Sequence, residues 1–532
     1  MNLRRTIARN TVYNGLGRAW EALTGLIVVA YVIHELGAGA YGLWAVAAAF
    51  TGYAALLDLG LSSGFAKFIA EHDARRESSE IAAVVATGTC VYAFLGTTFL
   101  LVTWPAAAWL IQDVLPRFAG AGSDWADPLV REELLFLVRG GLCLFVAGQV
   151  LAPFTAVATG LQRMDITNAW GAAAGAVKLM LLFYFMSGGH GIRSLLYAQA
   201  GSSVVFAAGM ICAVFVICPA LRTIRWRVSR RTFRRLFGFG WRSQVARLAN
   251  LVMFETDVLV IALLLHDFRI AGVYRVAVDL ANKLRQAGAI LLSALVPAAA
   301  HLDAQRDTVA LRALYLRATR YLAAFVVPAA LFLAVSAEWL IAAWVGPNID
   351  AAFAAGILRI LLAGYVANLM CGPGVAIALG RGDAGLVMRA GLLSMFANIG
   401  LTIALLYAVG FWGIPVATAI SMAVCWIWFA NAVAPTAGGG FAVQFAPAFK
   451  IPLQAAVPGA VIVAGMQLAG LAPANRLGQL AVVVAAGALF SLTYLLLLRR
   501  WRFFTPADGA VWRDLLPGRT AVPRAHTESA DA

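Results

Sequence analysis

The chain has 532 residues, of which 62% are hydrophobic and 13% are charged, and its formal net charge is +15. Soluble domains are roughly 45–50% apolar and about 25% charged, and even a large folded domain keeps much of its surface in water. The composition therefore excludes a soluble enzyme, a soluble nucleic-acid-binding protein and a disordered chain, and it predicts an integral membrane protein.

Apolar segments long enough to cross a bilayer recur along the whole sequence. A spanning helix needs about 20 predominantly apolar residues, because each residue adds about 1.5 Å to its length. The sequence thus predicts an all-α, polytopic integral membrane protein with about 14 transmembrane helices. The predicted spans are 10–33, 41–63, 81–110, 134–158, 168–187, 195–218, 239–265, 271–297, 320–344, 353–379, 386–408, 412–433, 451–471 and 477–498.

Lysine and arginine residues divide unequally between the two sides of this predicted bundle. With the N-terminus in the cytoplasm, 28 of the 41 lie on the cytoplasmic side, 5 lie on the other side and 8 lie within spans. Cytoplasmic loops carry the excess of positive residues in membrane proteins. We therefore expect both termini inside, and the net charge needs no nucleic acid as a partner.

Two short motifs recur six spans apart. The segment AYGLWAVA at 40–47 resembles IAGVYRVA at 270–277, which pairs Gly42 with Gly272, and LQRMD at 161–165 resembles LGRGD at 379–383. Six spans are an even number, so both halves insert in the same orientation. This arrangement predicts a parallel repeat about an axis normal to the membrane, with a site between the two halves.

The repeat predicts two six-helix lobes, followed by two C-terminal helices outside the repeat. The expected regions are an N-lobe at 1–220, a basic cytoplasmic linker at 221–238, a C-lobe at 239–434, spans 13 and 14 at 450–499, and a cytoplasmic tail at 500–532.

Each LxRxD motif places an arginine and an aspartate where two helices meet, and the four residues are Arg163, Asp165, Arg381 and Asp383. Side chains at helix ends satisfy free backbone groups and interact with the helix dipole. We expect a structural role for them in the cytoplasmic hairpins, and a gating role is the alternative.

Ionisable residues lie deep within several spans, where a charge costs about 2.5–3.5 kcal/mol on insertion scales. Such residues persist where they face water, a partner or a ligand. Cations outnumber anions here, which predicts a central cavity that binds an anion; neutralisation in structural ion pairs is the alternative. The deep cations are Arg18, Lys178, Arg247, Arg275, Lys283 and Arg285, and the deep anions are Glu21, Glu255, Asp257 and Asp279.

The four deep acids support a second hypothesis. Removal from water favours the protonated form of a carboxyl group, and intramembrane acids often mark ion pathways. The acids are therefore candidates for coupling transport to H⁺ or Na⁺. Local helix pairs, Arg18 with Glu21 and Arg275 with Asp279, would instead neutralise Glu21 and Asp279.

The six cysteines lie in apolar stretches without a CxxC pair or a neighbouring histidine cluster. Such cysteines are typical of small core residues rather than of disulfides or metal ligands. We therefore expect no metal site and no prosthetic group.

The segments LGAGAYGLWAVA at 36–47 and LLDLGL at 56–61, together with the fourteen spans, the repeat and the LxR loops, resemble a known family. The chain is similar to bacterial polysaccharide-biosynthesis flippases of the multidrug/oligosaccharidyl-lipid/polysaccharide exporter superfamily. The resemblance implies a V-shaped, two-lobe transporter of the bacterial inner membrane with a cationic central cavity. It also implies the cargo, undecaprenyl-diphosphate-linked oligosaccharide such as a polysaccharide or O-antigen repeat unit, which passes from the cytoplasmic to the periplasmic leaflet.

In that family the cargo's diphosphate would meet the surplus cations, and its lipid tail would stay in the membrane between the lobes. The resemblance further implies membrane lipids and polysaccharide polymerase machinery as partners. It transfers no individual residue, so the choice of cavity cations depends on their depth and on the repeat.

Two other functions stay open at this point. A small-molecule or drug antiporter of the same fold would suit an anionic or aromatic cavity better than a cationic one. A membrane-embedded polysaccharide polymerase or ligase would need catalytic groups on the outer side, where the sequence offers short loops. The sequence therefore favours a flippase that is not an enzyme.

Overall fold

A computed structural model describes residues 3–58, 60–118, 123–222, 227–292, 295–471 and 476–503. Within these residues the chain is almost entirely helical, and twelve segments are long and apolar enough to cross a membrane. The prediction of an all-α, polytopic membrane protein is confirmed. Much of the predicted tail, from residue 504 on, lies outside the described residues.

Two of the twelve segments each contain two predicted spans. In each of these segments a glycine interrupts the helix between the two spans. In α1 (Leu3–Tyr53), Gly37 has φ 81° and ψ 173°. Gly410, with φ 67°, separates α13 (Ala384–Val409) from α14 (Gly413–Ala432). Glycine adopts positive φ readily because it has no Cβ. The twelve segments therefore hold the fourteen predicted spans.

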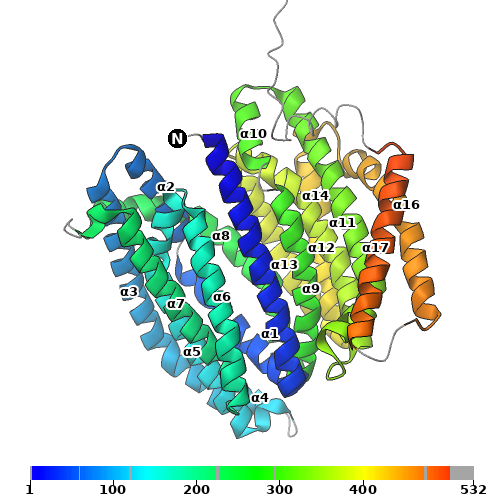
Figure 1. Ribbon diagram of the computed structural model, residues 1–532, viewed down its shortest axis with the longest axis horizontal. Helices are drawn as coiled ribbons and strands as arrows, with labels where there is room; N and C mark the ends of the chain where they lie inside the picture. Colours follow the sequence, from blue (N-terminus) through cyan, green and yellow to red (C-terminus); the bar gives the residue numbers. More distant parts are fainter. Residues whose placement is uncertain are drawn as a thin grey trace, which may run out of the picture.

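The helices form two bundles that stand side by side in Figure 1, with α1 running between them. The first bundle contains α1, α2 (Leu61–Ala74), α3 (Ser78–Ala108), α4 (Leu115–Phe118), α5 (Pro128–Gly160), α6 (Met164–Ser187) and α7 (Arg193–Ile217). The second contains α8 (Arg230–Val260), α9 (Phe268–Leu292), α10 (Leu295–Ala304), α11 (Thr308–Val345), α12 (Ala351–Gly380), α13 and α14.

The remaining helices are α15 (Ala434–Ala437), α16 (Phe441–Leu468) and α17 (Arg476–Arg500). The last two pack against each other and against α11, at the edge of the second bundle (Figure 1). Counted by predicted spans, each bundle holds six, because α1 contains two of them, and α16 and α17 hold the last two.

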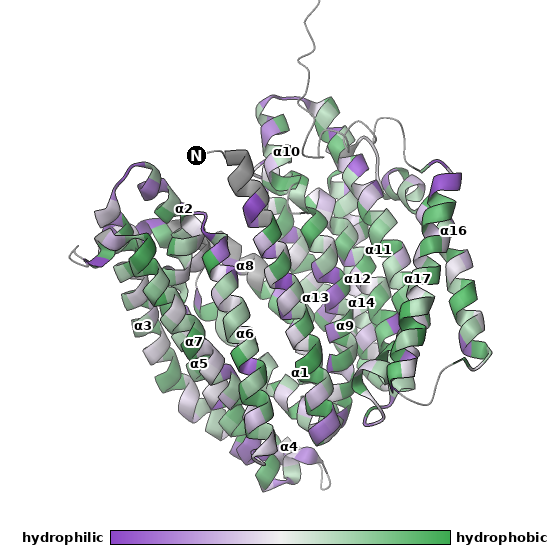
Figure 2. Cartoon of the chain, in the orientation of Figure 1, coloured by the Kyte–Doolittle hydropathy of each residue, from purple (hydrophilic) through white to green (hydrophobic). Residues whose placement is uncertain are grey.

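The two ends of the molecule differ. The start of α1 and α10 lie at one end, which we call the basic end, and α4 lies at the other, which we call the opposite end (Figure 1). Figure 2 shows hydrophilic residues gathered at both ends and hydrophobic residues along the helices between them. Apolar side chains such as Leu101, Phe396 and Val461 are exposed on the helix sides, as a lipid-facing surface requires.

The connection between the bundles is partly helical. Within the predicted linker 221–238, α8 begins at Arg230, and the Ser229 side chain accepts a hydrogen bond from the N–H of Thr232. Leu236 is buried and packs near Gly64 of α2. The linker therefore holds the start of α8 on the first bundle at the basic end.

Candidate functional site: the interface between the two bundles

Two glycines lie at the closest contact between the bundles. A Cβ on Gly42 of α1 would lie 1.7 Å from the carbonyl oxygen of Phe268, and a Cβ on Gly272 of α9 would lie 2.0 Å from that of Ala38. The same offset of 230 residues relates Gly42 to Gly272 and Ala38 to Phe268. The halves thus meet through equivalent residues, which is the contact pattern of a two-fold interface. The pair of glycines that the repeat matches lies face to face.

Further contacts join the bundles near this crossing, at the opposite end. The backbone N–H of Phe268 donates to the carboxylate of Asp124 at 2.7 Å. The indole N–H of Trp125, which is buried, donates to the carbonyl oxygen of Ala262 at 2.7 Å. A connection of the first bundle is therefore fastened to the second, and the molecule is closed at this end.

Arg275 lies about one turn from the glycine crossing and is held between two carboxylates. Its guanidinium donates to Glu255 of α8 at 2.9 Å and pairs with Asp279 at 3.2 Å. Asp279 also accepts a hydrogen bond of 2.6 Å from the hydroxyl of Tyr41 on α1. The network therefore crosses the interface and carries a net negative charge. Arg275, predicted as an anion-binding cation, is compensated here by its own acids.

We expect Arg275→Ala to destabilise the protein, because the substitution leaves two carboxylates without their cation. Removing one partner of a buried ion pair costs about 3–5 kcal/mol, and the Arg275 side chain is only 20% exposed. Thermal unfolding of the purified protein checks this prediction. Arg18→Ala, which breaks no ion pair among the described residues, is the control, and equal unfolding temperatures for the two variants would contradict it.

A cavity of about 600 Å³ lies inside the first bundle between α1, α5, α6 and α7. Arg18, Glu21 and Lys178 all line it. In the described part of the chain none of the three forms an ion pair within 4 Å, so the predicted helix pair of Arg18 with Glu21 is absent. This cavity, which we call the N-cavity, therefore has one positive charge in excess.

A second cavity, of about 280 Å³, lies inside the second bundle and is called the C-cavity. It is bounded by α8, α9, α12, α13 and α14, and four of these helices are the repeat counterparts of those around the N-cavity. Arg285 lines it, donates to Asn282 at 3.0 Å and lies over the ring of Phe254 at 4.5 Å. Arg285 has no carboxylate within 4 Å among the described residues.

Lys283 and Arg247 complete the set of predicted cations. The Nζ of Lys283 lies 3.6 Å from the Cβ position of Gly25 on α1, so this cation faces the other bundle. The side chain of Arg247 lies outside the described residues, although its backbone belongs to α8. Arg18, Lys178, Lys283 and Arg285 are therefore the predicted cations without an ion pair in the described part of the protein.

Asp257 is the most deeply buried of the predicted acids, with 4% of its surface exposed. Its Oδ2 accepts hydrogen bonds from Tyr274 at 2.5 Å and from Thr418 at 2.7 Å, and Asn398 donates to Thr418 at 3.0 Å. The other oxygens of this cluster have no partner among the described residues: Asp257 Oδ1, Asn398 Oδ1 and the hydroxyl of Thr402, which lies one turn from Asn398. Such orphaned buried atoms indicate an ion or water that satisfies them.

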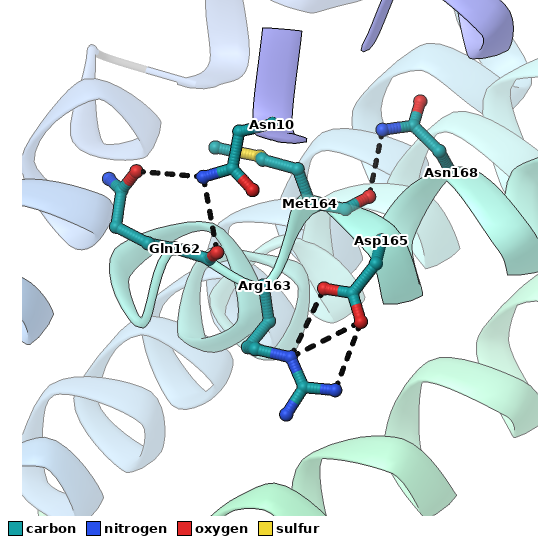
Figure 3. A network of polar contacts seen from close by, with 6 residues as sticks. All are labelled: Asn10, Gln162, Arg163, Met164, Asp165 and Asn168. Carbon is teal, nitrogen blue, oxygen red and sulfur yellow. Dashed lines mark hydrogen bonds and ion pairs between the residues drawn. The ribbon is translucent and has the colours of Figure 1, made fainter. Parts of the chain in front are cut away.

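The two LxRxD motifs join helix ends at the basic end. Figure 3 shows that Arg163 pairs with Asp165 at 3.0 Å and that Asn10 of α1 donates to the side chain and backbone of Gln162. The hydrogen bonds to Asp165 raise the pKa of the Arg163 guanidinium. Asn168 donates to the carbonyl oxygen of Met164 at 2.8 Å (Figure 3). These contacts fasten the start of α1 to the α5–α6 turn.

The second motif makes different contacts. Arg381 pairs with Asp303 of α10 at 3.3 Å and donates to Thr436 at 2.7 Å, while Asp383 caps α13 by accepting the N–H of Leu386. Each motif therefore holds helix ends together, which is the chemistry of a structural role.

An apolar groove of about 1020 Å³ runs along α9, α10, α11 and α17. Leu292 lines both this groove and the C-cavity, so an apolar channel and a cation-bearing cavity adjoin at that residue. Most of the lining is apolar, and Arg317 is its charged member; the lining includes Leu295, Tyr321, Phe325, Phe332 and Phe490.

Reasoning from charged residues alone missed the neutral partners of the buried acids. Thr418, Asn398 and Thr402 are polar residues within apolar spans, and the one-turn spacing of Asn398 and Thr402 marks a polar helix face. Tyr41 carries a similar signal, because a buried tyrosine hydroxyl needs a partner.

Comparison with known proteins confirms the resemblance stated from the sequence. A family of polysaccharide biosynthesis proteins matches residues 162–352. A curated protein of Shigella flexneri, whose name assigns it provisionally to O-antigen transport, is 21% identical over 257 residues, which are 47% of this chain and 57% of the relative. The match thus spans little more than half the length of that relative.

Solved transporter structures share the fold. The lipid II flippase MurJ in an inward closed conformation is similar with a TM-score of 0.64 and 13% identity over 93% of this chain and 99% of its own. An inward-facing multidrug resistance MATE family transporter of the MOP superfamily has a TM-score of 0.61 and 16% identity over 79% and 95%. A MOP superfamily transporter from Pyrococcus furiosus has a TM-score of 0.56 and 16% identity over 81% and 96%. These relatives and neighbours are transporters and flippases.

Proposed function

We propose that this protein moves polyprenyl-diphosphate-linked oligosaccharide across the bacterial inner membrane by alternating access. The observation that carries the proposal is the junction at Leu292 between the apolar groove and the cation-bearing C-cavity. A lipid-linked oligosaccharide needs both environments at once, because its tail is a hydrocarbon and its diphosphate is an anion.

The cations on either side of the interface suit the diphosphate. Lys283 faces α1, Arg285 lines the C-cavity, and Arg18 and Lys178 line the N-cavity. Charges in hydrocarbon are tolerated where a ligand or water receives them, and phosphate oxygens accept charge-assisted hydrogen bonds from arginine and lysine. The polyprenyl tail would occupy the groove beside α11 and α17.

Closure at the opposite end supports alternating access. The glycine crossing, the Tyr41–Asp279 hydrogen bond and the Asp124 and Trp125 contacts all join the bundles there. With the basic end in the cytoplasm and both termini inside, this is an inward-facing arrangement. Transport would then require these contacts to break while the basic end closes. In this movement one bundle would rock against the other.

Asp257 is the acid best placed to couple this movement to an ion. Its Oδ1, the Oδ1 of Asn398 and the hydroxyl of Thr402 are all buried oxygens without a partner among the described residues. Oxygen ligands are preferred by hard cations. In other transporters, backbone carbonyl oxygens of interrupted helices bind the coupling ion. We infer that Na⁺ binds here, with a proton on Asp257 as the alternative. Glu255 and Asp279 are engaged by Arg275, and Glu21 lines the N-cavity.

Complementation tests the function directly. In a bacterial strain that lacks its polysaccharide flippase, the protein is expected to restore surface polysaccharide and to remove the lipid-linked intermediate that accumulates. A drug antiporter of the same fold would instead leave polysaccharide unchanged and alter a resistance profile. Polymerase machinery would act on the delivered cargo as a partner.

Lys178→Met is expected to lower this complementation about tenfold or more, because it removes the N-cavity's lysine without breaking an ion pair. Lys178→Arg keeps the charge and should retain most of the activity. Membrane protein levels measured by immunoblot separate binding from folding. Arg230→Ala, on the exposed surface of the linker, is the control that should behave like the wild type.

A further inference from the structure

The N-cavity holds polar side chains that the protein leaves without partners. Gln199 and Ser203 of α7, Thr155 of α5 and Thr167 of α6 line it. In the described residues none of these side chains makes a hydrogen bond, and the Thr167 hydroxyl is fully buried. Polar groups without partners are costly within a membrane protein. The cavity is therefore built for a ligand that is itself rich in hydrogen-bonding groups.

An aromatic side chain is fixed in the wall of the same cavity. The indole N–H of Trp20 donates to the carbonyl oxygen of Ala172 at 3.1 Å, and the ring packs close to Gly175. Glu21 and Lys178 lie in the same lining. The cavity thus offers a fixed aromatic ring, hydroxyl groups, an amide and side chains of both charges. These groups are complementary to a saccharide, whose ring has apolar C–H faces and polar edges.

The C-cavity has fewer of these features although it occupies the equivalent place in the repeat; in the described residues Asn368 is its polar side chain without a hydrogen bond. Its volume is about 280 Å³ against about 600 Å³ for the N-cavity. Ser394 is engaged with Met253, Arg285 with Asn282, and much of the remaining lining is apolar. Sites for small organic ligands have volumes of about 300–1,000 Å³, so the N-cavity lies well within this range and the C-cavity lies at its lower limit.

We propose that the first sugars of the cargo dock in the N-cavity, where Gln199, Ser203 and Thr155 bind sugar hydroxyls and Trp20 packs against a sugar ring. The diphosphate would lie between the bundles, toward Lys283 and Arg285. This division assigns sugar selectivity to the first bundle and tail binding to the second. This assignment rests on the proposed flippase function and adds to it the residues that recognise the sugar.

Lipid binding to the full-length protein in nanodiscs tests this assignment with two probes, undecaprenyl diphosphate and undecaprenyl diphosphate linked to N-acetylglucosamine. The wild type is expected to bind the sugar-bearing lipid more tightly. Gln199→Leu should lower the affinity for the sugar-bearing lipid about three- to tenfold, which is the contribution of one or two hydrogen bonds. The affinity for undecaprenyl diphosphate should not change. Ser203→Ala is expected to act in the same direction and covers the case in which Gln199→Leu does not fold.

The matched control is Asn368→Leu, which makes the same change of side-chain type in the C-cavity. It should leave the ratio of the two affinities at the wild-type value. Equal wild-type affinities for the two lipids, or a ratio lost in Asn368→Leu and kept in Gln199→Leu, would overturn the assignment while the flippase function stands. A wild-type protein that binds neither lipid would overturn the proposed function itself.

Discussion

Gly42→Ala is expected to lower transport at least tenfold and to shift the protein away from the conformation described here. The added Cβ would lie 1.7 Å from the carbonyl oxygen of Phe268 and 2.8 Å from the backbone nitrogen of Gly272. Both atoms belong to the backbone, so two helices must separate. Overpacking typically costs about 1–3 kcal/mol, and each 1.4 kcal/mol is a factor of ten. The cost applies only to the state closed at this end, so the population moves toward the alternative state.

Gly39→Ala is the matched control, because a Cβ at Gly39 meets nothing within 4 Å. Gly272→Ala should reproduce the effect of Gly42→Ala, since the contact is symmetric. Complementation measures transport, and the distance between spin labels at Ala126 and Arg269, in a protein whose native cysteines are replaced, measures closure of this end. Normal transport and an unchanged distance in Gly42→Ala would show that the glycine crossing is not needed for closure.

Asp257→Asn is expected to abolish both ion-dependent stabilisation and coupled transport. A ligand at a hundred times its dissociation constant stabilises the folded state by about 2.7 kcal/mol. The wild type should therefore unfold at a higher temperature in sodium chloride than in choline chloride. The amide keeps the size of the side chain but removes the negative charge that the cation requires, so the difference between the two salts should vanish in the variant.

Thr402→Val provides a second, milder variant, because it removes one orphaned oxygen and leaves Asp257 unchanged. We expect it to reduce the sodium effect without removing it. Glu255→Gln alters an acid that is engaged by Arg275 and should keep the full sodium effect. A wild-type unfolding temperature that responds to pH and not to sodium would reject Na⁺ in favour of the proton. No response to either would remove Asp257 from the coupling proposal.

The membrane fold was predictable from the sequence because the bilayer leaves few choices. Backbone polar groups in hydrocarbon must bond within their own segment, so long apolar runs become helices. The glycines that break α1 and α13–α14 do not alter that result. The match of Gly42 with Gly272 was also readable, because a close crossing of two helices demands a residue without a side chain at the same place in each repeat.

The partners of the charged residues deep within the spans could not be predicted from the sequence in the same way. Arg18–Glu21 and Arg275–Asp279 are both local helix pairs in the sequence, yet among the described residues only the second forms. Arg275 also meets Glu255 of another helix, and its network extends to Tyr41, which is 238 residues from Asp279. Spacing within one helix carries no information about such neighbours.

By itself the sequence determined that the protein lies in a membrane, and it predicted the number of spans, the repeat and the excess of cations. These properties depend on composition and on patterns within single helices. Only the tertiary structure decided which cations lack an ion pair in the described residues, that Asp257 keeps one carboxylate oxygen without a partner there, and that two equivalent cavities differ in size. The physical reason is that charge compensation and cavity shape depend on side chains brought together from distant helices.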